Sequence, residues 1–143
     1  MQERTNMKLK EPFSLYTNLA FLPALYFSYF KGNLPYVLIL LSLFIFSTLF
    51  HLYKEEGSID WAQAKGKRHK VLLSIDTTLA SILIFYNLFT FYLNNFPPQF
   101  WYALPFALIG LYLFIFKSKA KYDKYHGLWH ILSGIVTLFA VLS

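Results

Sequence analysis

Two pairs of polar side chains, each within a mostly apolar stretch, have the spacing and the chemistry of a metal site. His126 and His130 are four residues apart in "HGLWH", and Ser47 and His51 are equally spaced in "STLFH". Residues i and i+4 lie on one face of a helix. Three neutral imidazoles can hold Zn²⁺ and leave its fourth position for water. We therefore expect one zinc ion bound by His51, His126 and His130.

An aspartate supplies the further group that hydrolytic chemistry at such an ion needs. Asp76, in "SIDTT", is the one acid inside a long apolar stretch. A carboxylate in lipid is costly unless it is paired, so it is a functional candidate by default. Bound zinc lowers the pKa of its water and polarises a carbonyl group. Asp76 would take the proton of that water, and Ser47 would donate to an oxyanion or hold Asp76 in place.

The composition indicates a membrane protein. Of the 143 residues, 57% are hydrophobic and only 14% are charged, whereas about a quarter are charged in a soluble domain. The charges gather in short stretches between long uncharged runs, which is typical of a polytopic membrane protein. The chain has no cysteine, which excludes disulfides and thiolate ligands. The excess of basic residues fits loops beside a membrane better than a nucleic-acid partner, so we expect none.

The apolar stretches predict one transmembrane domain over residues 1–143, an all-α polytopic helix bundle. Each stretch has about 18 to 23 residues, near the ~20 that cross ~30 Å of hydrocarbon. Pro35 falls in a first turn, where proline is tolerated, and Pro105 predicts a kink. The five expected spans are about 13–30, 34–53, 71–93, 99–116 and 126–143.

The distribution of basic residues predicts the orientation. Twelve of the 13 lysines and arginines lie in the N-terminal tail and in the loops after the second and fourth spans, and Lys31 alone lies on the other side. The positive-inside rule then puts the N-terminus in the cytoplasm and the C-terminus outside. Small size and lack of cysteine favour a bacterial inner membrane. In the loop after the second span, Ser58 predicts a capped short helix, and His69 is expected to face solvent or headgroups.

The candidate residues share one depth. A rise of ~1.5 Å per residue puts them within about 10 Å of the cytoplasmic face, so the metal site is expected there. A single histidine near a membrane boundary is usually an interfacial residue, and an aspartate in a span can pair with a serine or a buried water. The common depth and the two i,i+4 pairs favour the metal site over these separate explanations.

The set S-x3-H, then aspartate on the next helix, then H-x3-H on the last helix resembles the CREST superfamily of membrane hydrolases, which includes alkaline ceramidases and adiponectin receptors. "NLAFLPALYF" and "HGLWH" look like the first and last helices of its myomaker-related branch. The resemblance implies that the three histidines bind zinc, with Asp76 and Ser47 beside the metal-bound water. The superfamily usually has seven helices, so five spans make a shortened form. A second copy of the chain, in a homodimer, would supply the missing wall of the substrate cavity.

Three functions remain open on the sequence. The first is a zinc-dependent intramembrane hydrolase cleaving an amide or ester bond of a sphingolipid- or phospholipid-like membrane lipid. The second is non-enzymatic: a metal-stabilised receptor, fusion or scaffold protein. The third is a channel that uses Asp76 and the histidines as a proton relay, although Asn87 and Thr90 are too few for a polar path. An open metal position would favour the first function, and a fourth protein ligand the second.

Overall fold

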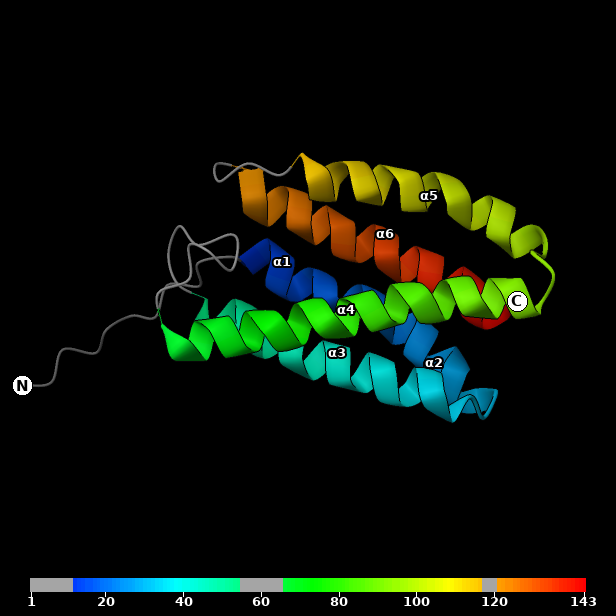
Figure 1. Ribbon diagram of the computed structural model, residues 1–143, viewed down its shortest axis with the longest axis horizontal. Coiled ribbons are helices and arrows are strands. Elements are labelled where there is room, and N and C mark those ends of the chain that lie inside the picture. Colours follow the sequence, from blue (N-terminus) through cyan, green and yellow to red (C-terminus); the bar gives the residue numbers. More distant parts are fainter. Residues whose placement is uncertain (1–11, 55–65, 117–120) are drawn as a thin grey trace, which may run out of the picture.

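The computed structural model describes residues 12–54, 66–116 and 121–143, and within these ranges all regular structure is helical. The helices lie lengthwise beside one another in a bundle (Figure 1). The expected all-α bundle is therefore confirmed, while the short helix expected at Ser58 lies outside the described residues. In chain order the elements are α1 (Pro12–Thr17), the 3₁₀ helix η1 (Asn18–Phe21), α2 (Leu22–Phe30), α3 (Leu34–Tyr53), α4 (Lys67–Leu93), α5 (Pro98–Ile115) and α6 (Tyr122–Leu142).

Four of the helices, α3 to α6, are long and apolar enough to cross a membrane. Large apolar side chains cover the outside of the bundle, and Phe85 on α4 and Trp101 on α5 are 71% and 61% exposed. Contiguous apolar surface of this extent is unfavourable in water but is the ordinary surface of a helix in lipid. These features agree with an integral membrane protein.

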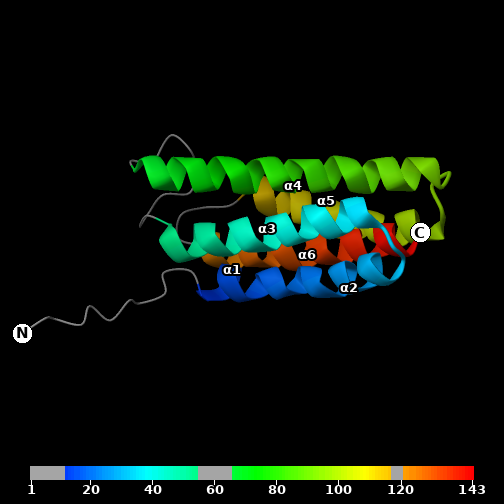
Figure 2. The ribbon, with the colours of Figure 1, turned by 90° about the horizontal axis from the view of Figure 1, so that it is seen from below.

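The first expected span, 13–30, is not one continuous helix. It consists of α1, η1 and α2, which follow one another along the bundle (Figure 2). The break has a local cause, because Pro23 has no amide hydrogen and its ring clashes with the carbonyl group four residues earlier. The chain tightens into the 3₁₀ turn of η1 just before it. Only four of the five expected spans are therefore continuous helices.

The other spans agree with the expected ranges within about one turn. α4 begins at Lys67 rather than residue 71, and α6 begins at Tyr122 rather than residue 126. Polar residues extend both helices at their N-terminal ends, since long basic side chains can bury their stems and keep the charge in water. α5 continues through Pro105 to Ile115. The early start of α6 places His126 in its second turn.

The two ends of the bundle differ in charge. One end holds the start of α1, the end of α3, the start of α4, the end of α5 and the start of α6 (Figure 1). Every described lysine and arginine lies at this end except Lys31. Lys31, at the other end, donates a hydrogen bond of 2.8 Å to the carbonyl oxygen of Val141 near the end of α6. A cation there complements the helix dipole.

α6 is the central helix of the bundle. α5, α1, η1, α2 and α4 all pack against it, and α3 packs mainly on α4. Two glycines allow the broken first span to approach α6 closely. A Cβ atom on Gly134 would lie 2.6 Å from the carbonyl oxygen of Ala20, and one on Gly127 would overlap the ring of Phe13. Small residues at such points let membrane helices pack at short distance.

Candidate metal centre

The three histidines singled out in the sequence converge in the structure. His51 comes from the last turn of α3, and His126 and His130 come from the first turns of α6. All three are buried, and each offers a ring nitrogen within 4.8 Å of the other two. Their ring centroids are 4.5 to 5.3 Å apart.

The cluster fits a metal ion held by imidazoles. Zinc–nitrogen bonds of about 2.0–2.1 Å in a tetrahedral site put the nitrogen atoms about 3.4 Å apart. The nitrogen atoms of the cluster lie within 4.8 Å of one another, at most about 1.4 Å farther apart than in such a site, and side-chain rotations can close this difference. The three ligand atoms come from two helices and leave room in the coordination sphere for a further group.

Hydrogen bonds from α1 orient His130. Its Nδ1 lies 3.2 Å from the carbonyl oxygen of Ser14 and 3.3 Å from Oγ1 of Thr17. The Thr17 hydroxyl donates its own proton to the Ser14 carbonyl at 3.0 Å, so both oxygens can only accept from the imidazole. Nδ1 therefore carries the proton, and the lone pair of Nε2 remains for a metal. Metal-binding histidines typically donate their other ring N–H to an oxygen in this way.

Asp123 holds α1 in place for this contact. Its carboxylate accepts from the backbone N–H of Ser14 at 2.8 Å and of Phe13 at 3.3 Å, and its backbone carbonyl accepts from the Ser14 hydroxyl at 2.9 Å. A carboxylate here satisfies amide groups that have no partner within the first turn of α1. Asp123 lies on α6, one turn before His126, so α6 both supplies the histidines and positions the helix that orients them.

The sequence reasoning missed this contribution from the first span. Ser14, Thr17 and Asn18 are all buried, at spacings of three and four residues. They form a polar face on an otherwise apolar helix, which is a signal of an internal polar contact. The spacing alone does not indicate which helix that face meets. Gly127, in the middle of "HGLWH", is explained by the same packing, since a Cβ there would also lie 3.1 Å from Oγ1 of Thr17.

Asp76 and Ser47 lie beside the cluster. Asp76, on α4, is buried, hydrogen bonds with the Ser47 hydroxyl and interacts electrostatically with His51. Ser47 Oγ is also 3.2 Å from Oδ1 of Asn18 in η1. The structure thus brings all five candidate residues together from α3, α4 and α6. His69 lies outside the group, and it is buried against Phe50 with ring centroids 5.4 Å apart rather than facing solvent or headgroups.

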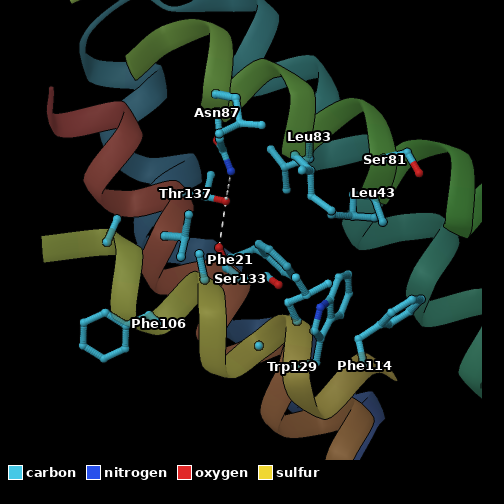
Figure 3. A pocket seen from close by; sticks show the side chains of 18 of the residues that line it. Phe21, Leu43, Ser81, Leu83, Asn87, Phe106, Phe114, Trp129, Ser133 and Thr137 are labelled. Atoms are coloured by element: carbon cyan, nitrogen blue, oxygen red, sulfur yellow. Dashed lines mark hydrogen bonds between the residues drawn. The ribbon is translucent and has the colours of Figure 1, made fainter. Parts of the chain in front are cut away.

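An apolar cavity extends from the cluster into the bundle. It has a volume of about 420 Å³ and lies among α4, α5 and α6, with Asp76 and His126 both in its wall. Figure 3 shows its lining from close by, with Trp129 and Phe114 on one side and Phe106 from α5. A cavity of this size, apolar apart from a few polar groups, is typical of a small-molecule site.

A polar brace crosses the wall of this cavity. Tyr36 Oη lies 2.9 Å from Oδ1 of Asn87 and 3.0 Å from Oγ1 of Thr90, and Asn87 Nδ2 donates to Oγ1 of Thr137 at 3.0 Å (Figure 3). The brace joins α3, α4 and α6. Polar groups in an apolar interior are paired in this way because an unpaired group costs about 1–3 kcal/mol. Asn87 and Thr90, weighed above as part of a polar path, are therefore engaged in structural hydrogen bonds.

The chain matches no protein family, curated protein or solved structure with which it was compared. Its function is therefore inferred from the geometry of the cluster and the cavity.

Proposed function

We propose that this protein is a zinc-dependent intramembrane hydrolase that cleaves an amide or ester bond of a membrane lipid. One observation supports this most strongly. His126 belongs to the three-histidine cluster and also lines the apolar cavity, together with Asp76. A lipid with its carbonyl group at the cluster and its hydrocarbon in the cavity matches both chemistries at once. Sphingolipid-like and phospholipid-like substrates both have this combination.

Each residue of the cluster has a role in this proposal. His51, His126 and His130 hold the zinc ion, and Ser14 and Thr17 orient His130. Bound zinc supplies Lewis-acid activation of a water molecule and of the lipid carbonyl. Asp76 accepts a proton from the water as its oxygen bonds to the carbonyl carbon. Asp76 then returns the proton to the nitrogen or oxygen that leaves as the C–N or C–O bond breaks.

Ser47 has a supporting role next to Asp76. Its hydroxyl hydrogen bonds with the Asp76 carboxylate and so limits the rotation of the base. The same hydroxyl can donate to the oxygen on which negative charge develops. A hydroxyl has one proton, so it serves Asp76, this oxygen or Oδ1 of Asn18, 3.2 Å away, one at a time.

The proposal extends to the family and to the membrane orientation. The five residues are those that resemble the CREST motif, and the chain would be a shortened form of that fold. The cluster lies toward the end of the bundle where the described basic residues gather, which supports a site near the cytoplasmic face. In this orientation the N-terminus is cytoplasmic and the C-terminus is outside. A bacterial inner membrane remains the proposed location.

One observation favours a second candidate, in which the metal is structural. Along their described lengths, α3 and α6 have almost no close backbone contact with one another, and α1 and η1 pack against both. A metal bound by His51 of α3 and His126 and His130 of α6 would join the two helices directly. The protein would then be a metal-stabilised receptor, fusion or scaffold protein.

Zinc analysis and lipid analysis together test both candidates. The protein is purified without added metal from cells producing the wild type, Asp76→Asn, His130→Ala or the control His69→Ala, which changes a buried histidine outside the cluster. We expect one zinc per chain in all but His130→Ala. Comparison of the membrane lipids should show hydrolysis products with the wild type and with His69→Ala only, because asparagine keeps the shape of Asp76 but cannot take a proton.

The outcomes separate the candidates. A wild-type protein without zinc would overturn both. Asp76→Asn with the lipid profile of the wild type, combined with early melting of His130→Ala, would overturn the hydrolase and leave the structural metal. A loss of general-base catalysis of about 10²- to 10⁴-fold in Asp76→Asn, with zinc retained, would support the hydrolase.

A further inference from the structure

The cavity is long and narrow. On α4 its lining residues extend from Asp76 to Phe91, and on the antiparallel α5 from Phe114 to Phe100. At a rise of 1.5 Å per residue these stretches measure about 22 Å and about 21 Å, so the two walls agree. Dividing the volume of about 420 Å³ by this length gives a mean cross-section of about 20 Å². That mean section is close to the section of one extended hydrocarbon chain.

The cavity has one open side. α4 and α5 both line it, yet along their described lengths they have almost no close backbone contact with one another. The outer faces of both helices carry exposed apolar side chains such as Leu88 and Leu111, which also line the cavity. In a bilayer the gap between α4 and α5 faces the lipid chains. A lipid tail can therefore enter sideways without crossing water.

Two aromatic rings lie at the end of the cavity far from the histidines. Phe91 and Phe100 meet edge to face with centroids 5.3 Å apart, and Phe96 supports Phe100 from 5.0 Å. Phe91 is only 2% exposed. No other lining residue on α4 or α5 lies farther from Asp76 along the helices. The turn between α4 and α5 brings both rings close to each other, so the ring pair marks the far end of the lining.

The wall between the two ends requires no polar ligand. Asn87 and Thr137, near the middle, are hydrogen-bonded to each other, and Asn87 is also bonded to Tyr36. A polar group of an occupant at this level would find Asn87 and Thr137 already hydrogen-bonded. An unsubstituted hydrocarbon leaves the brace intact and gains only from burial.

We infer that the cavity holds a single acyl chain with its carbonyl at the histidine end, and that the Phe91–Phe100 pair sets the longest chain accepted. A staggered carbon chain advances about 1.25 Å per methylene, as bonds of about 1.5 Å dictate. About 22 Å of cavity therefore holds about 16 to 18 carbons. The inference relies on the proposed function for the reaction at the histidine end, but not for the binding of the chain.

Binding of fatty acids of increasing length tests the stop. A series of saturated fatty acids competes with a radiolabelled one for the purified protein in nanodiscs. Affinity should rise with length up to about 16 to 18 carbons and then fall. Phe91→Ala should move this limit upward by about three to four carbons, the length that the lost ring occupied. Ala103→Leu, one turn inside the stop, should move it downward by a similar amount.

Two controls keep the test decisive. Phe85→Ala removes an equal ring from the outside of α4 and should leave the limit unchanged. His130→Ala removes a metal ligand and should keep the wild-type length profile. A protein that binds chains selectively but hydrolyses no lipid would support this inference and overturn the proposed function. Hydrolysis with no limit near the expected length, or an equal limit in Phe91→Ala, Ala103→Leu and the wild type, would overturn the inference.

Discussion

Alanine in place of Gly134 should weaken the packing of the first span on α6, whereas alanine in place of Gly110 should not. A Cβ atom at Gly134 would lie 2.6 Å from the carbonyl oxygen of Ala20 and 2.9 Å from the carbonyl carbon of the same residue. These are backbone atoms of η1, so no side chain can turn away to make room. The nearest atoms to a Cβ at Gly110 are 3.6 Å away in Leu132, which is ordinary van der Waals contact.

The two substitutions should therefore differ in their effect on stability. At Gly134, η1 must move outward by about 0.8 Å to reach ordinary contact, and overpacking of this kind costs about 1–3 kcal/mol. Alanine favours a helix over glycine by at most about 1 kcal/mol, and less in a membrane, where helices form before they associate. We expect a net loss of up to about 2 kcal/mol at Gly134. Gly110→Ala should be neutral or slightly stabilising.

Gly127→Ala adds a functional readout to this comparison. Its Cβ would overlap the ring of Phe13, an exposed side chain that can turn away. It would also lie 3.1 Å from Oγ1 of Thr17, so this hydroxyl must give way and its contact with His130 would weaken. Loss of a hydrogen-bond partner of a metal-binding histidine typically lowers metal affinity about 10- to 100-fold. Gly127→Ala should therefore lose zinc affinity as well as stability.

Thermal unfolding in nanodiscs and competition with a zinc chelator measure the two effects. The expected order of melting temperature is Gly110→Ala at or above the wild type, and Gly134→Ala clearly below it. The reasoning is wrong if Gly134→Ala melts with the wild type, because the close approach of η1 to α6 would then not exist. Wild-type zinc affinity in Gly127→Ala would contradict the expected weakening of the contact between Thr17 and His130.

Three further predictions concern the contact of Thr17 with His130, the membrane orientation and the polar brace. Thr17→Val keeps the shape of the side chain but removes the hydroxyl at His130, and should weaken zinc binding by up to 10- to 100-fold in the chelator competition; unchanged affinity would contradict the contact. A reporter fused after Ser143 should read as external, and a cytoplasmic reading would reverse the proposed orientation. Tyr36→Phe removes the donor to Asn87 and should lower stability by about 1 kcal/mol with zinc content unchanged, whereas a loss of zinc would show that the brace and the metal centre are coupled.

The local features of this protein were predictable from the sequence because they depend on neighbouring residues. Long apolar runs form membrane helices wherever they meet the rest of the chain, so the ranges of α3 to α6 were expected within about one turn. The i,i+4 spacing puts His126 and His130 on one face of any helix that forms there. Counting residues from the basic loops gave His51 and Asp76 a similar depth, and the structure brings both beside that face.

The break in the first span was missed although its cause is local. Pro23 and Asn18 were visible in the sequence, but the hydropathy of 13–30 alone suggests a continuous span. The 3₁₀ turn at Asn18–Phe21 relieves the clash that Pro23 would cause in an α-helix.

The sequence by itself determined the ranges of α3 to α6, which of their residues are chemically unusual and at about what level of the bundle those residues lie. Only the tertiary structure decided that α1 orients His130, that Asp123 anchors α1 and that a narrow cavity leads from the cluster between α4 and α5. These features depend on distances between helices far apart in the chain. Such distances are set by close contacts at Gly127 and Gly134 and by the fit of side chains across several interfaces at once, so no single segment contains the information.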